Sequence, residues 1–458
     1  MKKFIGDKIF YRKVLMLMIP IMIQNGITNF VNMLDNVMIG RVGNVEMTGV
    51  AIANQLVFVF NICIFGALSG AGIFGAQFFG KGDHQGLQYT FRFKTILCLI
   101  LTTVGISVFV FCGNQLIGLY LGGEGSAEDV AGSLRFAREY LSIICIGLLP
   151  HTIAQCYSST LRETGQTKIP MFAGLAAVIV NLCFNYVLIF GAFGLPAMGV
   201  RGAAIATVAS RFVELFVVAW WTHAHANKNA FIRGVYRSVY IPGQLTVQIL
   251  VKGLPLLFNE AMWATGIAFI NQCYSTRGYD VVSANNICQT FFNVFGVAFM
   301  AVGASIAIIL GQLLGAGKLE EAKESSRKLI AFSVFVSTMV SCVFFICAGW
   351  IPEFYKTTDQ VRTLATHLMQ ICALTMPMDA MAHACYFTMR SGGKIGITLL
   401  FDSGFVWCIS LPTVFFLCRE TAMSVLVVYA ICQLLNLTKC VAGSILVEKG
   451  IWLKNMVE

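Results

Sequence analysis

Long apolar runs alternate with short polar segments along the whole chain. A helix needs about 20 mainly apolar residues to cross a bilayer, and it satisfies its own backbone groups where no water is present. Segments of about ten residues with alternating polarity, which mark a membrane β-barrel, are missing. The pattern therefore predicts twelve membrane-spanning helices, over residues 14–39, 47–73, 93–112, 137–160, 168–190, 199–222, 247–273, 281–310, 328–350, 363–389, 394–417 and 421–447.

The composition agrees with this pattern. Of the 458 residues, 57% are hydrophobic and 12% are charged, which is about half the charged share of soluble domains. So little charge excludes a soluble enzyme, a disordered chain and a disulfide-stapled secreted domain. The 16 cysteines are scattered through apolar runs without metal-ligand spacing, so we interpret them as small apolar residues and expect no cofactor. The predicted fold class is an all-α integral membrane protein.

Lysine and arginine are divided unevenly between the two sides of the predicted spans. With the N-terminus inside, the inner segments hold 23 of the 32 basic residues and the outer segments hold 8. Because basic residues in short loops mark the cytoplasmic side, both termini are predicted to be cytoplasmic. The net charge of +10 follows mostly from this bias and does not require a nucleic-acid partner. The N-terminal segment lacks a small-residue cleavage site, so we expect the first span to act as an uncleaved insertion signal.

The sequence also repeats itself weakly. A shift of 235 residues places Pro20 on Pro255, and it aligns the stretch GAQFFGKGD with LGQLLGAGK without a gap. A shift of 228 places Arg162 on Arg390. Internal repeats of this kind are typical of secondary transporters, which bind their substrates between the repeats.

The repeat predicts two six-helix bundles, residues 1–222 and 246–458, joined by a cytoplasmic linker of residues 223–245. Each half has an even number of spans, so both halves have the same orientation. Their pseudo-two-fold axis should therefore lie along the membrane normal, with the substrate path between the halves. The prolines at equivalent positions, Pro20 and Pro255, are candidate bend points; ordinary membrane-helix kinks are the alternative.

Polar side chains concentrate on the first two helices of each half. Seven lie along one side of the first span, and they cannot face lipid. We infer that the first, second, seventh and eighth spans line a wet central cavity. The side chains expected in this cavity are Asn32, Asn36, Asn54, Trp263, Asn286 and Gln289.

Five acids fall within predicted spans, where a charge costs about 2.5–3.5 kcal/mol or more and implies a compensating environment. Asp35 lies among amides, and carboxylate with amide oxygens suits a hard cation, although Asp35 could also merely end its span. Glu214 lies three residues from Arg211, which favours a structural ion pair. Glu260 and Asp379 have no cation in their own spans, and Asp402 stands alone in its span.

His383 follows Asp379 by one helical turn on the same face. Because histidine titrates near neutrality, this pair could relay protons. The alternative, which we favour slightly, is a histidine that is hydrogen-bonded between helices. Together with Asp402, His383 is a possible accessory coupling residue.

Several motifs together resemble the MATE (multidrug and toxic compound extrusion) family, and its bacterial NorM/DinF-like members in particular. The match runs nearly from end to end, and only the combination is specific. The stretches that carry it are Pro20, DNVMIGRVG (35–43), AQFFGKGD (76–83), LRETGQTKIPM (161–171), NLCFNYVLIFGAFGLPAMGVRGAAIATVASR (181–211), LPLLFNEAMWATG (254–266), GQLLGAGK (311–318), PMDAMAHACYFTMRSGGK (377–394) and FDSGFVWCISLP (401–412).

The resemblance implies a secondary antiporter, not an enzyme, in the inner membrane of a bacterium. It would export small organic cations and other amphipathic drugs in exchange for H+ or Na+, and we expect a monomer. A flippase for lipid-linked saccharides, which has a related architecture, is the alternative. The excess of acids over bases in the expected cavity disfavours the flippase, because a pyrophosphate group needs cations.

The resemblance also implies where the coupling ion binds. Asp35 occupies the position of the family's acid in the first span. The second acid of some members, in an N-x3-D motif of the fifth span, is replaced here by Asn181 and Asn185. NorM-like relatives carry acids in the seventh and tenth spans, where Glu260 and Asp379 fall. A sodium site at Asp35, or at Glu260 with Asp379, and a proton site both stay open.

Overall fold

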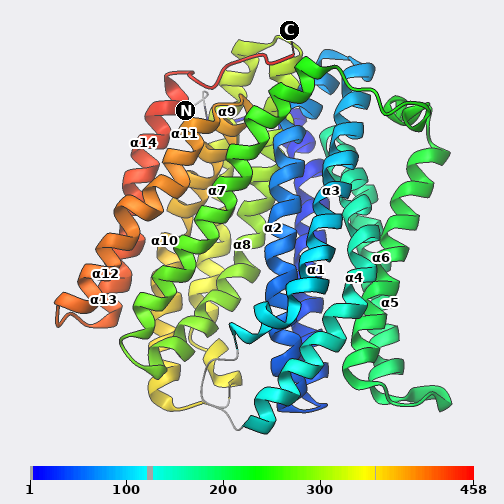
Figure 1. Ribbon diagram of the computed structural model, residues 1–458. Coiled ribbons are helices and arrows are strands. Elements are labelled where there is room, and N and C mark those ends of the chain that lie inside the picture. Colours follow the sequence, from blue (N-terminus) through cyan, green and yellow to red (C-terminus); the bar gives the residue numbers. More distant parts are fainter. Residues whose placement is uncertain (1–3, 121–126, 356, 458) are drawn as a thin grey trace. The chain divides into compact units, whose positions relative to one another are not determined.

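The computed structural model describes residues 4–120, 127–355 and 357–457, and over these residues the chain is built of helices (Figure 1). Most of the helices are longer than the predicted spans, because they continue beyond the apolar stretch into polar residues. The α-helices are α1 (Lys8–Gly40), α2 (Asn44–Lys81), α3 (His84–Gly118), α4 (Ala127–Glu163), α5 (Lys168–Phe190), α6 (Gly199–Ala224), α7 (Gly243–Ser275), α8 (Tyr279–Gly315), α9 (Leu319–Cys347), α10 (Asp359–Ser391), α11 (Ile395–Leu399), α12 (Leu411–Glu420), α13 (Val425–Leu434) and α14 (Asn436–Glu448).

Eleven helical segments of the described chain are long and apolar enough to cross a membrane. They correspond to eleven of the twelve predicted spans. The remaining prediction, residues 363–389, coincides with α10, a helix of 33 residues. The all-helical prediction is confirmed.

Two of the predicted spans are continuous helical segments made of shorter pieces. In the segment Ile395–Glu420, π-helical turns over Leu400–Gly404 and Val406–Ser410 separate α11 from α12. The segment Val425–Glu448 joins α13 and α14. A π turn admits one extra residue per turn and is rare, and it occurs mostly at functional sites.

The chain forms two compact units. Unit 1 contains residues 1–22, 76–82 and 254–458, and unit 2 contains residues 23–75 and 83–253. The divisions cut α1 after Met22, α2 after Gly75 and α7 after Gly253. Two of these cuts lie within two residues of Pro20 and Pro255, where proline removes a backbone hydrogen bond from the helix. The halves predicted from the repeat, residues 1–222 and 246–458, stay a prediction.

Within unit 1, α8, α9 and α10 pack against one another around an apolar core. Three serines of α9, spaced four residues apart, donate hydrogen bonds to backbone carbonyls of α10. Ser333 donates to Ala380 over 3.4 Å and Ser337 donates to Met376 over 3.1 Å. Small side chains allow helix backbones to approach closely where lipid offers no driving force for association. In unit 2, α4, α5 and α6 pack against one another in the same way.

The ends of α2 and α8 cross within unit 1 at two glycines of the repeated motif. A Cβ atom on Gly80 would lie 1.9 Å from the carbonyl oxygen of Gln312, and one on Gly315 would lie 1.9 Å from that of Gln77. Only glycine permits so close an approach of two backbones. The two contacts are related by the 235-residue shift seen in the sequence.

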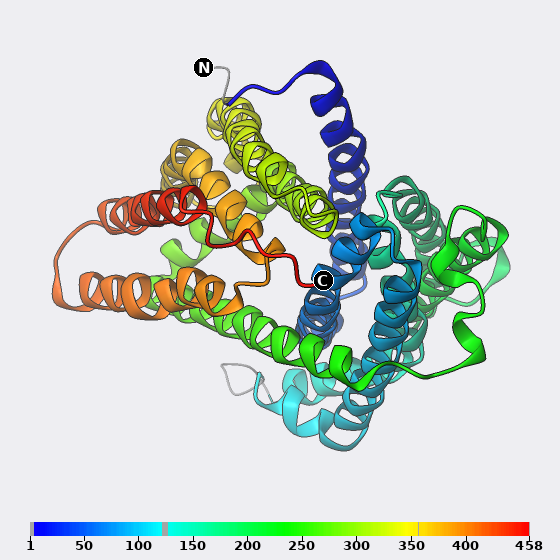
Figure 2. The ribbon, with the colours of Figure 1, turned by 90° about the horizontal axis from the view of Figure 1, so that it is seen from above.

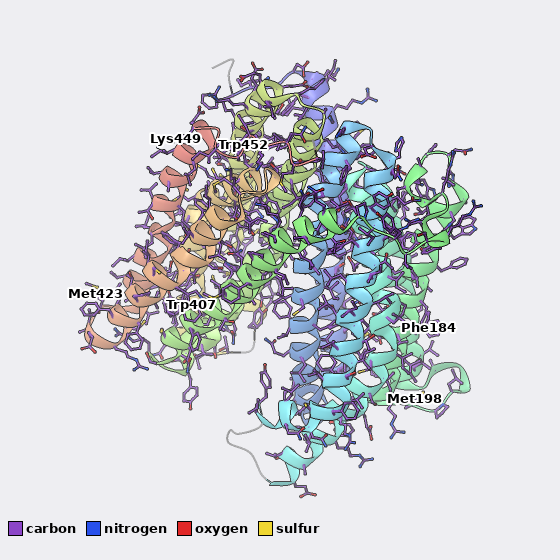
Figure 3. All side chains as sticks on the ribbon, turned by 45° about the horizontal axis from the view of Figure 1, so that its top comes forward. Phe184, Met198, Trp407, Met423, Lys449 and Trp452 are labelled. Atoms are coloured by element: carbon purple, nitrogen blue, oxygen red, sulfur yellow. The ribbon has the colours of Figure 1, made fainter. Side chains whose placement is uncertain are left out.

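The C-terminal segment runs from α14 toward the end of α2 (Figure 2). The Gln77 side chain donates to the carbonyls of Ser391, over 3.1 Å, and Lys454, over 3.3 Å, and it accepts a 2.8 Å bond from the amide of Met456. Trp452 of this segment is fully buried (Figure 3). These contacts attach the chain's end to unit 1.

Candidate functional site

The first group of intramembrane polar residues lies in unit 2, where α1, α5 and α6 meet. Asn185 donates a 2.6 Å hydrogen bond to Asp35 Oδ1 and a 3.1 Å bond to Asn181 Oδ1. Asn181 in turn donates to the hydroxyl of Thr207, over 3.4 Å. Asn181 and Asn185 lie one turn apart on α5, so their side chains share one face of the helix, and both are buried. The structure thus brings together Asp35, Asn181 and Asn185, three of the five residues that the resemblance associates with coupling.

The side-chain oxygen of Asn185 has an unusual environment. Among the described residues it is buried and has no hydrogen-bond partner, although the neighbouring amide group donates to Asp35. Buried polar atoms are nearly always paired, so an unpaired oxygen beside a carboxylate calls for an explanation. Carboxylate and amide oxygens are the ligand types that hard cations take in proteins.

Arg211, a basic residue of α6, is paired with an acid other than Asp35. Arg211 forms its ion pair with Glu214, over 3.3 Å on the same helix. This is the i, i+3 pair that the sequence predicts. Gln155 also donates to Glu214, over 3.4 Å, and His151 lies 3.9 Å from it. Within the described part of the chain, Asp35 has no lysine, arginine or histidine at ion-pair distance.

The second group lies in unit 1 and begins at Glu260 of α7. Its Oε1 accepts hydrogen bonds from Arg390, over 3.2 Å, and from the hydroxyl of Tyr386, over 3.3 Å. The Arg390 guanidinium also lies over the rings of Tyr386 and Phe387, at 5.7 and 5.3 Å from their centres. The side chain of Glu260 is 19% exposed and that of Arg390 is 5% exposed. Glu260 is therefore compensated by a cation from α10.

Asp402 is compensated as well. Its Oδ1 lies 3.1 Å from the ammonium nitrogen of Lys439 on α14, and its Oδ2 accepts a 3.4 Å bond from Asn259 on α7. Ser403 holds Asn259 in place by donating a 2.7 Å bond to its side-chain oxygen. The sequence places Asp402 alone in its span, and in the structure a lysine from another helix reaches its carboxylate.

Asp379 accepts a 2.8 Å bond from the side-chain amide of Asn436 on α14. Lys439, one turn further along α14, acts on Asp379 through its charge. His383 packs instead against the rings of Phe299 and Phe387. In the ranges that the structure describes, no hydrogen bond or ion pair joins His383 to Asp379, so the predicted pair is not formed.

The residues predicted to line a wet cavity differ in how exposed they are. The side chains of Asn32 and Asn36 lie outside the described residues, although α1 passes through both positions. Asn54 on α2 and Asn286 on α8 are exposed, Gln289 is half-buried, and Trp263 is 41% exposed.

Sequence reasoning misses the cations that compensate these acids and a further buried ion pair. Arg390, Lys439 and Lys94 count among the 23 basic residues of the inner segments, and Glu163 lies beyond the predicted span 137–160. In the structure Lys94 of α3 forms a 2.5 Å ion pair with Glu163 of α4, and their side chains are 0% and 8% exposed. One signal was available, since Lys439 falls inside the predicted span 421–447. Its partner Asp402 could not be identified, because it lies on another helix.

The chain matches a family model described as MatE over residues 20–187 and 255–403. It is 24% identical over 420 residues to a protein of Thermotoga maritima named "Probable multidrug resistance protein NorM", with 91% of this chain and 87% of that protein covered. A Bacillus subtilis protein of the same name is 23% identical, with 88% and 87% covered. Among solved structures, that of a Vibrio cholerae MATE transporter, VcmN, superimposes with a TM-score of 0.86 at 15% identity and covers 97% of this chain and 98% of its own. This last likeness concerns the fold.

Proposed function

The chain belongs to the MATE family of multi-pass membrane transporters, and on this premise we propose that it exports organic compounds, often cationic ones, in exchange for H+ or Na+. The names of its relatives support multidrug export as the activity. We place the chain in the inner membrane of a bacterium as a monomer, with both termini cytoplasmic. The two six-helix halves, residues 1–222 and 246–458, and bends at Pro20 and Pro255 are parts of this proposal.

The observation that carries the proposal is the environment of Asp35. Its carboxylate is held by an amide rather than by a cation, and the oxygen of Asn185 beside it has no partner among the described residues. A charge in such a place is costly unless it is neutralised. A proton or a sodium ion that binds there removes this cost. Binding of the ion therefore changes the relative free energies of the conformations between which the transporter alternates.

Exchange follows from this neutralisation. An ionised carboxylate in the membrane attracts an organic cation, and the same carboxylate loses that attraction when it holds a proton or Na+. The coupling ion therefore releases the exported cation on the outer side. In unit 1, Asp379 is the acid that has an amide and no ion-pair partner within the described residues, and it can serve in the same way.

The proposal is tested with the full-length protein in proteoliposomes. A fluorescent organic cation is loaded, and its movement is recorded under an imposed pH gradient or an imposed Na+ gradient. One of the two gradients is expected to drive transport, and Asp35→Asn is expected to reduce the driven transport to the background of empty vesicles. Asp379→Asn is examined in parallel. Unchanged transport in both variants would refute the coupling assignment.

Asn185→Asp distinguishes the two coupling ions. It places a second carboxylate at hydrogen-bond distance from Asp35, and two carboxylates this close share a proton. Transport by the variant is therefore expected to follow the pH gradient, with the ratio of H+-driven to Na+-driven transport raised about tenfold. Asn114→Asp, the same substitution at an exposed position of α3, is the matched control.

A further inference from the structure

The ammonium group of Lys439 lies in a cage of two aromatic rings and one carboxylate. Its nitrogen is 3.1 Å from Asp402 Oδ1 and 5.4 Å from the ring centres of both Phe401 and Phe405. The side chain is 12% exposed. Aromatic faces with a carboxylate are the arrangement by which proteins recognise alkylammonium ions, because the rings attract the charge and also contact the methylene groups.

The backbone at this cage is irregular. Phe401 and Asp402 belong to the π turn Leu400–Gly404, and Phe405 lies between this turn and the next one, Val406–Ser410. The two phenylalanines are one turn apart, so their rings lie on the same side of the segment with Asp402 beside them. Two consecutive π turns are unusual, and π turns are found mostly where a helix serves a function.

The ion pair of Lys94 and Glu163 differs from that of Lys439 and Asp402 in what surrounds the lysine nitrogen. Lys94 has two oxygens of Glu163 at 2.5 and 2.6 Å, and the hydroxyls of Ser159 and Thr160 lie at 3.1 and 3.2 Å. Its nitrogen is surrounded by oxygen, and its side chain is fully buried. The Lys439 nitrogen has one oxygen partner and two aromatic rings near it. This environment suits a ligand that carries its ammonium group on an apolar stem, whereas the oxygen-rich environment of Lys94 suits a permanent internal ion pair.

We propose that Phe401, Asp402 and Phe405 form a binding site for the alkylammonium group of an organic cation, and that Lys439 is the tethered occupant of this site. A cation that enters takes the place of the lysine at Asp402. The role of the site in transport rests on the proposed function, but ammonium binding itself does not.

The experiment uses Lys439→Ala in the full-length protein, purified in detergent. This substitution removes three methylenes and the ammonium group, which together correspond to propylammonium. The unfolding temperature is recorded while propylammonium chloride or sodium chloride is added at equal ionic strength. Saturable stabilisation is expected, with half-saturation at an about tenfold lower concentration of propylammonium than of sodium. Lys449→Ala, at the exposed end of the same helix (Figure 3), is the matched control and should respond equally to both salts.

Two further variants separate the carboxylate from the rings. Lys439→Ala with Asp402→Asn is expected to lose the response to propylammonium. Lys439→Ala with Phe401→Leu and Phe405→Leu is expected to respond equally to the two salts. An equal response in Lys439→Ala itself would show that only the lost charge is replaced, and it would overturn the proposal, as would no response to either salt.

If Lys439→Ala unfolds during purification, Lys439→Leu replaces it, with methylammonium as the probe, because leucine ends at its δ carbons and leaves open the positions of the lysine Cε and Nζ atoms. The same preference over sodium is expected, and equal responses again overturn the proposal. These measurements detect ammonium binding and do not depend on transport. Loss of the propylammonium preference with intact transport would overturn the proposed site alone, and an intact preference without transport would overturn the proposed function alone.

Discussion

In unit 2, Asp35 has one amide partner, Asn185, and no ion-pair partner among the described residues, whereas in unit 1 Arg390 pairs with Glu260 and Lys439 pairs with Asp402. Both arrangements keep carboxylates within membrane helices, but the free-energy cost of the buried charge is offset in different ways. An acid held by amides is neutralised by an ion from outside, and an acid held by a lysine or arginine is neutralised from within. This comparison is why the proposed coupling ion is assigned to Asp35 before Glu260 or Asp402.

The largest effect on stability is expected at the buried ion pair of Lys94 and Glu163 in unit 2. Lys94→Met leaves Glu163 buried without its cation, so the free energy of unfolding should fall by about 3–5 kcal/mol. Denaturation of the purified protein in detergent measures the loss. The double variant Lys94→Met with Glu163→Leu should recover most of it, since no charge remains buried. A single variant as stable as the original chain would show that the pair adds little.

The second prediction contrasts the two acids directly. Asp402→Asn leaves the Lys439 ammonium without its carboxylate and should lower the free energy of unfolding by about 2–3 kcal/mol, because both side chains are slightly exposed. Asp35→Asn should change it by less than about 1 kcal/mol, because no cation loses its partner and an asparagine oxygen can still accept the bond from Asn185. Equal losses in the two variants would remove the distinction between Asp35 and Asp402.

The third prediction concerns the crossing of α2 and α8 in unit 1. Gly80→Ala and Gly315→Ala each place a Cβ atom 1.9 Å from a backbone oxygen, and each should cost about 1–3 kcal/mol through displacement of the helices. Gly396→Ala is the control, because a Cβ atom there has no neighbour within 4 Å. Thermal unfolding of the three variants is compared. Very different losses at Gly80 and Gly315 would contradict the equivalence that the repeat predicts.

The smallest effect is expected at an exposed ion pair of unit 2. Arg201 lies 3.1 Å from Glu139, but its side chain is 58% exposed, and water already solvates both charges. Arg201→Gln should therefore leave the unfolding temperature unchanged and should not alter transport. A clear loss of stability would mean that this exposed ion pair stabilises unit 2 more than its exposure to water predicts.

The sequence by itself determined the helices and their approximate limits. Hydropathy is a local property, and a run of apolar residues must form a helix in a bilayer whatever its neighbours are. The sequence also indicated which acids are worth attention, because a charge in an apolar run is conspicuous. Asp35, Glu260, Asp379 and Asp402 were all found in this way.

Only the tertiary structure decided which of these acids are compensated. Asp402 and Lys439 are 37 residues apart and Glu260 and Arg390 are 130 residues apart, so no spacing along one helix reveals either pair. The sequence suggested a partner for Asp379 in His383, one turn away, but the packing of α14 against α10 provides Asn436 instead. The partner of a buried charge depends on which helices are neighbours, and that is a property of the folded chain rather than of any segment of it.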